Sequence, residues 1–306
     1  MHVAIAIVGF RNADDIACCL RALERLTYAD FEVVICENGG QEAFDALERQ
    51  LPKRLAGGQS VRMVLPGGNL GYAGGVNVCI RETPDADAWW ILNPDTQPEP
   101  DVLTLQVARL SIGDCDAVGS TIYLADGRVQ SHGGRWRPWL ARAVSLGHGS
   151  LLSSEPDKAD IERRQNYLNG ASMMMGRRFL NTVGPMREEY FLYCEEVEWC
   201  LRGGRLGMRL GYTPGARVLH YAGTTTGSYD DIRRRPKMPV YLNERNKMLM
   251  TWDCFPARLP IAAVASFLLL FLRFGRRGAW RQVGYGGAGW TAGLLNRRGM
   301  PNWAAT

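Results

Sequence analysis

The sequence predicts an α/β protein built on a mostly parallel sheet with helices on both faces. Of its 306 residues, 46% are hydrophobic and 22% are charged, which is typical of a globular chain and excludes a disordered or collagen-like one. Short β-branched runs alternate with segments of helical spacing, in units of about 25–30 residues, as in βαβ folds. The length fits two domains or one enlarged α/β domain.

The elements of the first part of the chain follow in order. Each predicted strand is a short apolar run that ends in a polar turn, and each predicted helix begins shortly after that turn. The strands are residues 3–8, 31–36, 61–65 and 88–92, and the helices are residues 14–26, 41–51 and 71–81. Ligands of such sheets bind at the carboxyl ends of the strands, so turns 9–12, 37–40 and 93–95 are expected to lie together.

Beyond residue 115 the alternation is weaker. Residues 121–165 are rich in turn signals, and the charged segment 155–164 is predicted to be a mobile loop. A stretch rich in glycine and methionine, 169–176, precedes a helix that begins near Arg177, and 195–202 has helical spacing. We find no internal repeat.

The cysteines and the N-terminus favour a cytosolic protein. No C-x-x-C pair occurs among the eight cysteines, and most of them lie in apolar runs, so buried reduced thiols are expected. A basic leader and a cleavage site are both missing from the first residues, so secretion is not expected.

The net charge of +5 is concentrated at the end of the chain. No acidic residue follows Asp253, whereas seven arginines do, which leaves 29 of the 36 basic residues against all 31 acidic ones before that point. Such a tail is expected to meet a polyanionic surface. Nucleic acid is not the favoured surface, because no zinc-finger, RNP or helix-turn-helix signature accompanies the charge.

The same tail contains an apolar run, residues 259–272. As a helix it would reach about 21 Å, short of the roughly 30 Å hydrocarbon core. We therefore expect a helix that lies in the membrane interface, with its arginines on anionic headgroups. The alternative is a buried helix that packs on the body of the protein.

Several motifs carry groups suited to catalysis. Asp95, at the tip of a buried strand, is suited to hold a divalent cation against a diphosphate, although Asn-Pro-Asp is also a common turn. Glu37 ends the second strand, where an acid often binds a ribose, or else it is a helix N-terminal charge. His220 ends an apolar run and is either a metal ligand or structural.

Two further segments are longer. The glycine-rich helix start at residues 69–77 allows close approach of a ligand, but it is neither a Walker loop nor a dinucleotide fingerprint. The carboxylates of segment 188–198 are expected to raise one another's pKa, so that one of them acts as a general base. The alternative is a set of solvated acids at a helix start.

The order and spacing of these motifs resemble glycosyltransferase family 2 of the GT-A type, in particular its rhamnosyltransferase-like branch. The matching stretches are 3–12, 33–39, 69–77, 90–100, 169–202, 212–228 and 241–250. The resemblance implies a GT-A (Rossmann-like) fold and inverting transfer of a sugar from a nucleotide diphosphate sugar to an acceptor hydroxyl. It implies a GT-A domain over 1–250, with a nucleotide-binding half (1–120) and an acceptor-binding half (121–250). Residues 251–306 would form a membrane-associating helical extension.

The resemblance also implies roles for individual residues. Asp95 and His220 would hold manganese or magnesium, and Glu196 would be the catalytic base, with Glu195 as the second candidate. Three positions depart from the family pattern, because Glu37, Asn93 and Glu196 each stand where many members carry Asp. The nucleotide-binding residues would be Gly9, Phe10, Asn12, Glu37, Asn38, Asn69, Gly74 and Asn93.

A basic cluster follows the loop at residues 223–228. It consists of Arg233, Arg234, Arg235 and Lys237, with Arg245 in a later family segment. These residues are expected to close over the phosphates of the donor or to meet the diphosphate of a lipid-linked acceptor. A solvated charge run is the alternative.

The predicted function is therefore a metal-dependent inverting glycosyltransferase at the cytoplasmic face of the cell membrane. The expected donor is dTDP-L-rhamnose, and the expected acceptor is a polyprenyl-diphosphate-linked or polysaccharide intermediate. The alternatives are another donor (a UDP- or GDP-sugar, or galactofuranose), a sugar nucleotidyltransferase, and a non-catalytic nucleotide-sugar-binding module.

Overall fold

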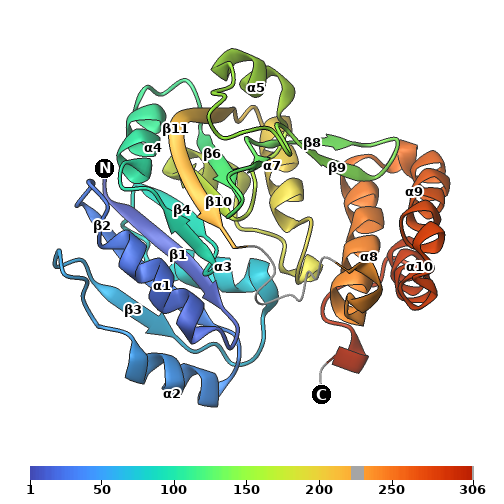
Figure 1. Ribbon diagram of the computed structural model, residues 1–306, viewed down its shortest axis with the longest axis horizontal. Coiled ribbons are helices and arrows are strands. Elements are labelled where there is room, and N and C mark those ends of the chain that lie inside the picture. The colour runs from blue at the N-terminus through green and yellow to red at the C-terminus, as the bar shows by residue number, and fades with distance from the viewer. Residues whose placement is uncertain (222–230, 305–306) are drawn as a thin grey trace.

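The computed structural model describes residues 1–221 and 231–304, which form a nine-stranded sheet flanked by helices and a C-terminal group of three helices (Figure 1). The loop at residues 223–228, predicted to close over phosphates, lies outside the described residues. The α/β prediction is confirmed.

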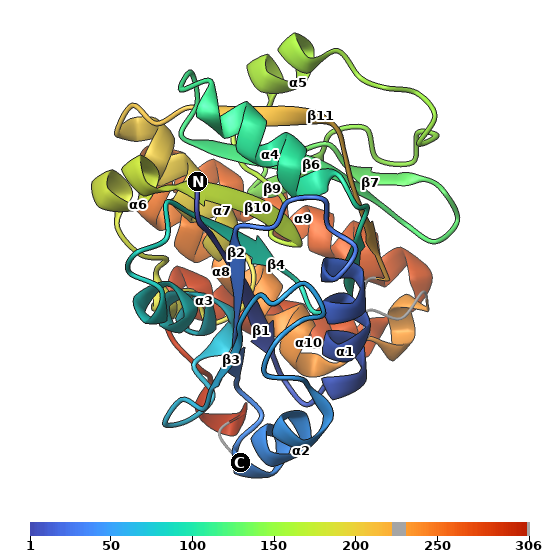
Figure 2. The same cartoon turned by 90° about the vertical axis from the view of Figure 1, so that its left-hand side faces the viewer.

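The first four strands form the parallel part of the sheet, in the order β3-β2-β1-β4. Alternate residues of β1 face opposite sides, so that Ile5 and Ile7 pack with α1 while Ala4 and Ala6 pack with α3. Figure 2 shows α3 on the other side of the sheet from α1 and α2. The bounds are β1 Val3–Gly9, α1 Ala13–Leu23, β2 Phe31–Glu37, α2 Gln41–Gln50, β3 Val61–Val64, α3 Gly71–Glu82 and β4 Ala88–Leu92.

Beyond β4 the sheet becomes mixed, which the prediction of a mostly parallel sheet did not include. Strand β10 runs antiparallel between β4 and β6, with Ser172 opposite Leu92. This direction brings residues 169–171, which precede β10, to the edge where β4 ends. The remaining strands are β5 Thr96–Pro98, β6 Ala117–Tyr123, β7 Val129–Ser131, β10 Ser172–Gly176 and β11 Leu210–His220.

The prediction of a mobile loop over 155–164 is wrong, because most of this segment is helix α5 (Lys158–Arg164). Asp157 caps the helix by accepting a bond from the Ala159 amide, and Ile161 is buried. Glu162 bonds Arg109 and the Tyr212 amide. The sequence analysis did not predict this helix because most of its residues are charged and only a few of its side chains make buried contacts.

The other helices of the body and a small hairpin complete this half. The hairpin, β8 and β9, is a separate two-stranded sheet on the side of the C-terminal helices (Figure 1). The bounds are α4 Val102–Ser111, β8 Gly134–Arg137, β9 Arg142–Ser145, α6 Arg177–Val183 and α7 Glu195–Arg205.

Three C-terminal helices stand beside the sheet: α8 (Lys237–Cys254), α9 (Leu259–Phe274) and α10 (Trp280–Leu294) (Figure 1). Helix α10 packs closely on α8 because Gly289 and Gly293 lack side chains. A Cβ on Gly289 would lie 2.1 Å from the Tyr241 carbonyl oxygen. The predicted boundary at residue 250 falls within α8.

The apolar run belongs to a longer helical segment than predicted. Short 3-10 turns extend α9 at both ends. The segment Pro256–Arg277 has 22 residues, and its most apolar 18-residue stretch has a mean hydropathy of 1.8. Its length and composition suffice to cross a membrane, yet one face of α9, including Ala262, Ser266 and Leu270, is buried against the other helices.

Candidate active site

The first predicted pair, Asp95 and His220, meets at the edge of the sheet. Strand β5 pairs antiparallel with β11, so that His220 lies opposite Thr96. The His220 Nε2 is 3.2 Å from an Asp95 carboxylate oxygen, and both side chains are largely buried. Two residues 125 positions apart in the sequence therefore share one site.

Gln130, which the sequence analysis missed, orients the imidazole. Its amide oxygen lies 2.7 Å from the His220 Nδ1. Because a carbonyl oxygen only accepts, Nδ1 is the donor, which leaves Nε2 toward Asp95. The only sequence signal was the position of Gln130 in a short polar strand.

The donor chemistry of this pair fits a divalent cation. A carboxylate oxygen and an imidazole nitrogen are two ligands, and diphosphate oxygens and water would supply the others. Among the residues that the structure describes, no group of three or more His, Cys, Asp or Glu is placed to hold a metal. The protein alone thus offers a two-residue site, which a bound diphosphate would have to complete.

Glu195 and Glu196 begin α7 and are the second predicted centre. Burial raises the pKa of Glu195 to about 8, with a further contribution from the charge of Glu196, and burial raises the pKa of Glu196 to about 7. One Glu195 carboxylate oxygen is buried and has no hydrogen-bond partner among the described residues. Near neutral pH each of these carboxyl groups can therefore change between its protonated and its ionised form, as a general base must.

The other acids of segment 188–198 are neutralised by partners. Glu188 bonds Asn77 and faces Arg81, and Glu198 bonds Arg202. Glu189 pairs with Arg298. Within the described parts of the chain, Glu195 and Glu196 form no ion pair, which separates them from the rest of the predicted carboxylate cluster.

Tyr72, also missed, lies between the two centres. Its hydroxyl donates to the Gly170 carbonyl at 2.7 Å, and a Cβ on Gly170 would lie 3.5 Å from the Glu196 Cγ. Burial raises the pKa of Tyr72 well above its usual value, and the charges of Glu195, Glu196 and Asp95 raise it further. The Tyr72 phenol therefore lies close enough to all three predicted carboxylates for their charges to affect its pKa.

Segment 169–171 connects the same two centres through its backbone. The Asn93 amide donates to the Ala171 carbonyl at 3.0 Å, next to the Asp95 turn. One residue earlier, Gly170 faces Glu196. Residues 169–171 thus lie between the carboxyl end of β4 and the start of α7.

The loop before α7 is strained and braced from α8. Phe191, Tyr193 and Cys194 have positive φ values of 66°, 76° and 69°, which non-glycine residues rarely adopt. The Asn246 side-chain amide donates to the carbonyls of Tyr190, Leu192 and Tyr193 at 2.7–2.9 Å. These bonds fix the loop from which both glutamates project.

Arg245 is the neighbouring brace. It is 1% exposed, and it donates to the carbonyls of Tyr190 and Gly299 and to Asn246. Burial lowers the pKa of Arg245 to about 10. Its donors bond the protein itself, whereas the sequence analysis placed it at phosphates or the acceptor.

The predicted nucleotide side is held by Glu37 and Asn38. One Glu37 oxygen accepts from the amides of Arg11 and Gly39 at 3.0 and 2.7 Å, and the side chain is buried. Asn38 is also buried, and it bonds the backbone of Leu70 and Gly71. Together the two residues thus shape the loops that follow β1, β2 and β3.

The remaining predicted nucleotide residues lie in these same loops. Asn12 accepts from the Phe10 amide, and Asn69 accepts from the Gly71 amide. Phe10 is 40% exposed at this edge. Gly9 packs on Glu37, and Asn93 follows β4 directly.

The glycines at the start of α3 approach protein atoms rather than open space. A Cβ on Gly71 would lie 2.1 Å from the Phe191 carbonyl oxygen, and one on Gly74 would lie 2.5 Å from the Leu70 Cβ. The Tyr72 amide donates to the Phe191 carbonyl at 2.7 Å. These glycines let the helix start pack on the loop before α7, a role that spacing alone did not reveal.

The basic run before α8 docks on the C-terminal helices. Arg233 donates from Nε to the Arg277 carbonyl, and the Lys237 ammonium lies 3.8 Å from the centre of the Trp303 ring. Gln282 of α10 donates to the carbonyls of Arg233 and Arg235. The run is therefore held in place along the C-terminal helices.

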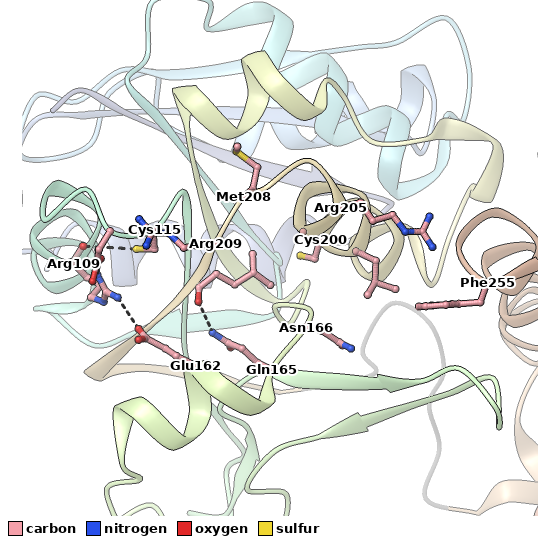
Figure 3. A pocket seen from close by; sticks show the side chains of 14 residues that line it. Arg109, Cys115, Glu162, Gln165, Asn166, Cys200, Arg205, Met208, Arg209 and Phe255 are labelled. Atoms are coloured by element: carbon pink, nitrogen blue, oxygen red, sulfur yellow. Dashed lines mark hydrogen bonds and ion pairs between the residues drawn. The ribbon is translucent and has the colours of Figure 1, made fainter. Parts of the chain in front are cut away.

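A cavity of about 600 Å³ lies away from these residues. Figure 3 shows Arg109, Glu162 and Cys200 among the side chains that line it. None of the predicted site residues lines this cavity. The candidate site is instead the edge of the sheet described above.

Comparison with known proteins finds a matching family model and several related sequences. The family model for Glycosyl transferase family 2 matches residues 5–182. The chain is 23% identical over 257 residues to the low-salt glycan biosynthesis hexosyltransferase Agl10 of Haloferax volcanii, covering 83% of this chain and 76% of that protein. It is 28% identical over 228 residues to N-acetylglucosaminyl-diphospho-decaprenol L-rhamnosyltransferase of Mycobacterium tuberculosis, covering 68% of this chain and 72% of that protein.

Two solved structures share the fold. The Pyrobaculum calidifontis mannosyltransferase, in complex with GDP-Man and Mn²⁺, has a TM-score of 0.58 at 14% identity, covering 97% of this chain and 88% of that one. GalNAc-T7, with UDP, GalNAc and Mn²⁺, has a TM-score of 0.62 at 13% identity. The match covers 82% of this chain but 48% of GalNAc-T7.

Proposed function

The chain belongs to glycosyl transferase family 2, and from that premise we propose that it moves a hexose, with inversion, from a nucleotide diphosphate sugar to an acceptor hydroxyl. The proposed donor is dTDP-L-rhamnose, supported by the mycobacterial rhamnosyltransferase among the relatives. The observation that carries the proposal is the convergence of Asp95, His220 and the Glu195–Glu196 pair around Tyr72 and residues 169–171.

Asp95 and His220 would hold a divalent cation. Bound there, the cation would stabilise the negative charge that develops on the departing nucleoside diphosphate. The imidazole nitrogen is a softer ligand than the oxygens that Mg²⁺ prefers, so Mn²⁺ is the better match. Solved structures of the same fold contain Mn²⁺.

Glu196 would be the catalytic base. It is less buried than Glu195 and faces the open side of Gly170. With a pKa near 7 it is able to take the proton of the acceptor hydroxyl as that oxygen attacks the anomeric carbon. Burial at this helix start keeps that pKa raised, and the charge of Glu196 raises the pKa of Glu195 further.

The nucleoside would lie over the ends of β1 and β2, where Phe10 is exposed beside the loops held by Glu37 and Asn38. The acceptor would be a lipid-linked or polysaccharide intermediate at the cytoplasmic face of the membrane. A relative named for a diphospho-decaprenol substrate supports the lipid-linked class. Arg234 and Arg235 are the proposed phosphate-binding members of the basic run.

A thermal-shift screen of dTDP, UDP and GDP, each with and without Mn²⁺, tests donor and metal together. The preferred nucleotide should raise Tm only when Mn²⁺ is present, because a ligand of the folded state stabilises it. Asp95→Asn should abolish the Mn²⁺ dependence, whereas Asp126→Asn, in an exposed turn, should not change it. Equal shifts with and without Mn²⁺ in the wild-type protein would exclude the proposed metal site.

Substitution of the base tests the chemistry separately. Glu196→Gln should lower kcat about 10²–10⁴-fold while nucleotide binding is kept. The wild-type kcat should rise with pH through about 7, since only the ionised carboxylate accepts a proton. If the Glu196 variant keeps its turnover, the catalytic base is Glu195 and not Glu196.

A further inference from the structure

A small cavity between α8, α9 and the loop before α7 contains arginines that the proposed binding of the donor and its metal does not use. Its volume is about 100 Å³. The side chains that define it are Tyr193 of the loop, Arg235, Asn243 and Glu244 at α8, and Arg273 and Phe274 at the end of α9. Arg273 is one of the tail arginines that the sequence analysis expected on anionic headgroups.

The positive charge of this cavity is not neutralised. The Arg235 Nε is buried without a hydrogen-bond partner, and neither Arg235 nor Arg273 forms an ion pair with any described carboxylate. The single acid in the cavity, Glu244, bonds Lys247 at 2.6 Å. Two unpaired guanidinium groups at one opening are suited to bind phosphate oxygens in pairs.

The surroundings add to this charge. Burial lowers the pKa of Arg273, the charge of Arg235 lowers it further, and Arg277 and Arg142 contribute in the same direction, against Glu244. Four cations held this close repel one another. A bound dianion would remove that repulsion.

The cavity lies within reach of the proposed base. Tyr193, in its wall, precedes Glu196 by three residues, which span at most about 11 Å even when fully extended. A saccharide that begins at the cavity can therefore present a hydroxyl to Glu196. The donor diphosphate, by contrast, is assigned to Asp95 and His220.

An apolar face of α9 leads to the same arginine. Each of its side chains is more than 40% exposed, and they recur at helical spacing up to Leu272, next to Arg273. From Ile261 to Leu272 the face extends about 16 Å. We call it the α9 apolar face, and its residues are Ile261, Val264, Phe267, Leu268, Phe271 and Leu272.

The charges around the α9 apolar face favour lipid over protein as its partner. Arg273, Arg276, Arg277 and Arg281 follow it, and no acid occurs after Asp253. Trp280, 61% exposed, packs on Phe271 with ring centres 5.7 Å apart. An apolar helix face edged by arginines and tryptophan is typical of a helix that lies in an anionic membrane surface.

We propose that the cavity binds the diphosphate of a lipid-linked saccharide acceptor through Arg235 and Arg273, while the α9 apolar face lies in the membrane that holds the lipid. This inference rests on the proposed glycosyl transfer, and it assigns the place and chemistry of the acceptor. The buried opposite face of α9 keeps the helix on the protein, so it lies along the surface.

Binding of farnesyl diphosphate, measured by calorimetry, tests the cavity. Arg235→Gln and Arg273→Gln should each weaken this affinity at least about tenfold, because each removes a charged donor. Arg276→Gln, an exposed arginine of the same segment outside the cavity, should change it less than about twofold. Farnesol and inorganic pyrophosphate should bind far more weakly than farnesyl diphosphate.

Nucleotide binding separates this inference from the proposed function. With Mn²⁺, the preferred nucleoside diphosphate should bind the Arg235 and Arg273 variants as tightly as it binds the wild type, which also shows that they are folded. Unchanged farnesyl diphosphate binding in both variants would overturn the acceptor site and leave the donor site intact. Weakened nucleotide binding in these variants would mean that the arginines bind the donor and not the acceptor. Binding of pyrophosphate as tight as that of farnesyl diphosphate would mean an adventitious anion only.

Sedimentation with vesicles tests the α9 apolar face. The protein should pellet with vesicles of phosphatidylcholine and phosphatidylglycerol and less with phosphatidylcholine alone. Leu268→Glu should reduce pelleting at least about fivefold while farnesyl diphosphate binding is retained. Ile112→Glu is the matched control, since Ile112 is 66% exposed on another helix end. Undiminished pelleting of the Leu268 variant would overturn the membrane assignment.

Discussion

Single side chains mark the candidate site, some by the partners that they bind and others by the lack of an ion-pair partner. Most buried ionic groups of the described chain have partners, for example Glu198 with Arg202 and Asp116 with Arg178. Glu195 and Glu196 form no ion pair within the described chain, and burial raises the pKa of both. Such an arrangement reduces stability, which indicates that it is kept for chemistry.

Glu195 is expected to lower the stability of the folded protein as pH rises. Below its ordinary pKa the group is protonated in both states, whereas between about 4.5 and about 8 only the unfolded chain ionises, so stability falls across that range. Glu195→Gln should therefore raise the free energy of unfolding, relative to wild type, by at least about 1 kcal/mol more at pH 8 than at pH 5. Urea unfolding at both pH values measures it.

Glu198→Gln is the matched control, because Glu198 is equally buried but bonded to Arg202 and Arg187. This substitution should destabilise the protein at both pH values, since it removes the buried charge that Arg202 and Arg187 share. A Glu195 variant that behaves like the Glu198 variant would mean that Glu195 has a bonding partner in solution.

Gln130 is expected to act as a positioning residue for the metal. Gln130→Ala should raise the Mn²⁺ concentration for half-maximal activity about tenfold, because the imidazole loses the acceptor that fixes its tautomer. Gln130→Glu, which also accepts at Nδ1, should restore most of the affinity. A merely structural role would lower Tm without moving the Mn²⁺ titration, and that result would refute the assignment.

Elements far apart in the sequence hold the loop before α7 between them. The loop before α7 receives hydrogen bonds from α8 on one side, through Asn246, and contacts the start of α3 on the other, through Gly71. Its positive φ values persist because these contacts outweigh the local strain. The position of Glu196 is thus a property of three elements together.

Removal of the α8 brace should release the loop. Asn246→Ala removes a donor from three carbonyls, of which that of Tyr190 also accepts from Arg245. The variant should therefore lose about 1–3 kcal/mol of stability, and its kcat should fall more than its donor KM rises. A displaced pH profile for kcat would show that the environment of the glutamates has changed. Asn302→Ala, at an exposed position, is the control, and equal kinetics for the two variants would contradict the bracing role.

At the scale of the whole molecule, the C-terminal extension and the catalytic body form one unit. After α10 the chain returns to the loop before α7, where Arg298 bonds Asp253 and Glu189. Tyr190 and Arg187 complete this cluster around Asp253. Helix α9, which packs on α8 and α10, is therefore mechanically connected to the loop before α7.

Arg298→Gln should loosen this connection. Burial tends to raise the pKa of Asp253, but hydrogen bonds from Arg298 and Tyr190 outweigh it, so the pKa of Asp253 is below its usual value. Stability from the pair is present near pH 7 and is lost as pH falls through that lowered pKa. The variant should lose about 1–2 kcal/mol at pH 7 and progressively less below about pH 4.

The matched control is Arg297→Gln, the exposed neighbouring arginine, which should stay within about 0.5 kcal/mol of wild type. Denaturant unfolding at pH 7 and pH 3.5 distinguishes the two. An Arg298 deficit that does not depend on pH would mean that packing, not the ion pair, connects the tail to the body.

The sequence by itself determined the local elements and the chemical types at their ends. Apolar runs and helical spacing located β1 to β4 and α1 to α3, because period and turn residues are local properties. The motifs also named Asp95, His220 and Glu196 as candidates. Helix α5 was missed because its buried contacts involve few residues amid many charges.

Only the tertiary structure decided which of these groups act together. The antiparallel entry of β10, the glutamine behind His220, the strained loop held from α8 and the arginines beside α9 all depend on contacts between distant residues. Spacing along the chain carries no information on such contacts, since burial and partner choice, which set pKa and charge balance, arise only when the elements pack.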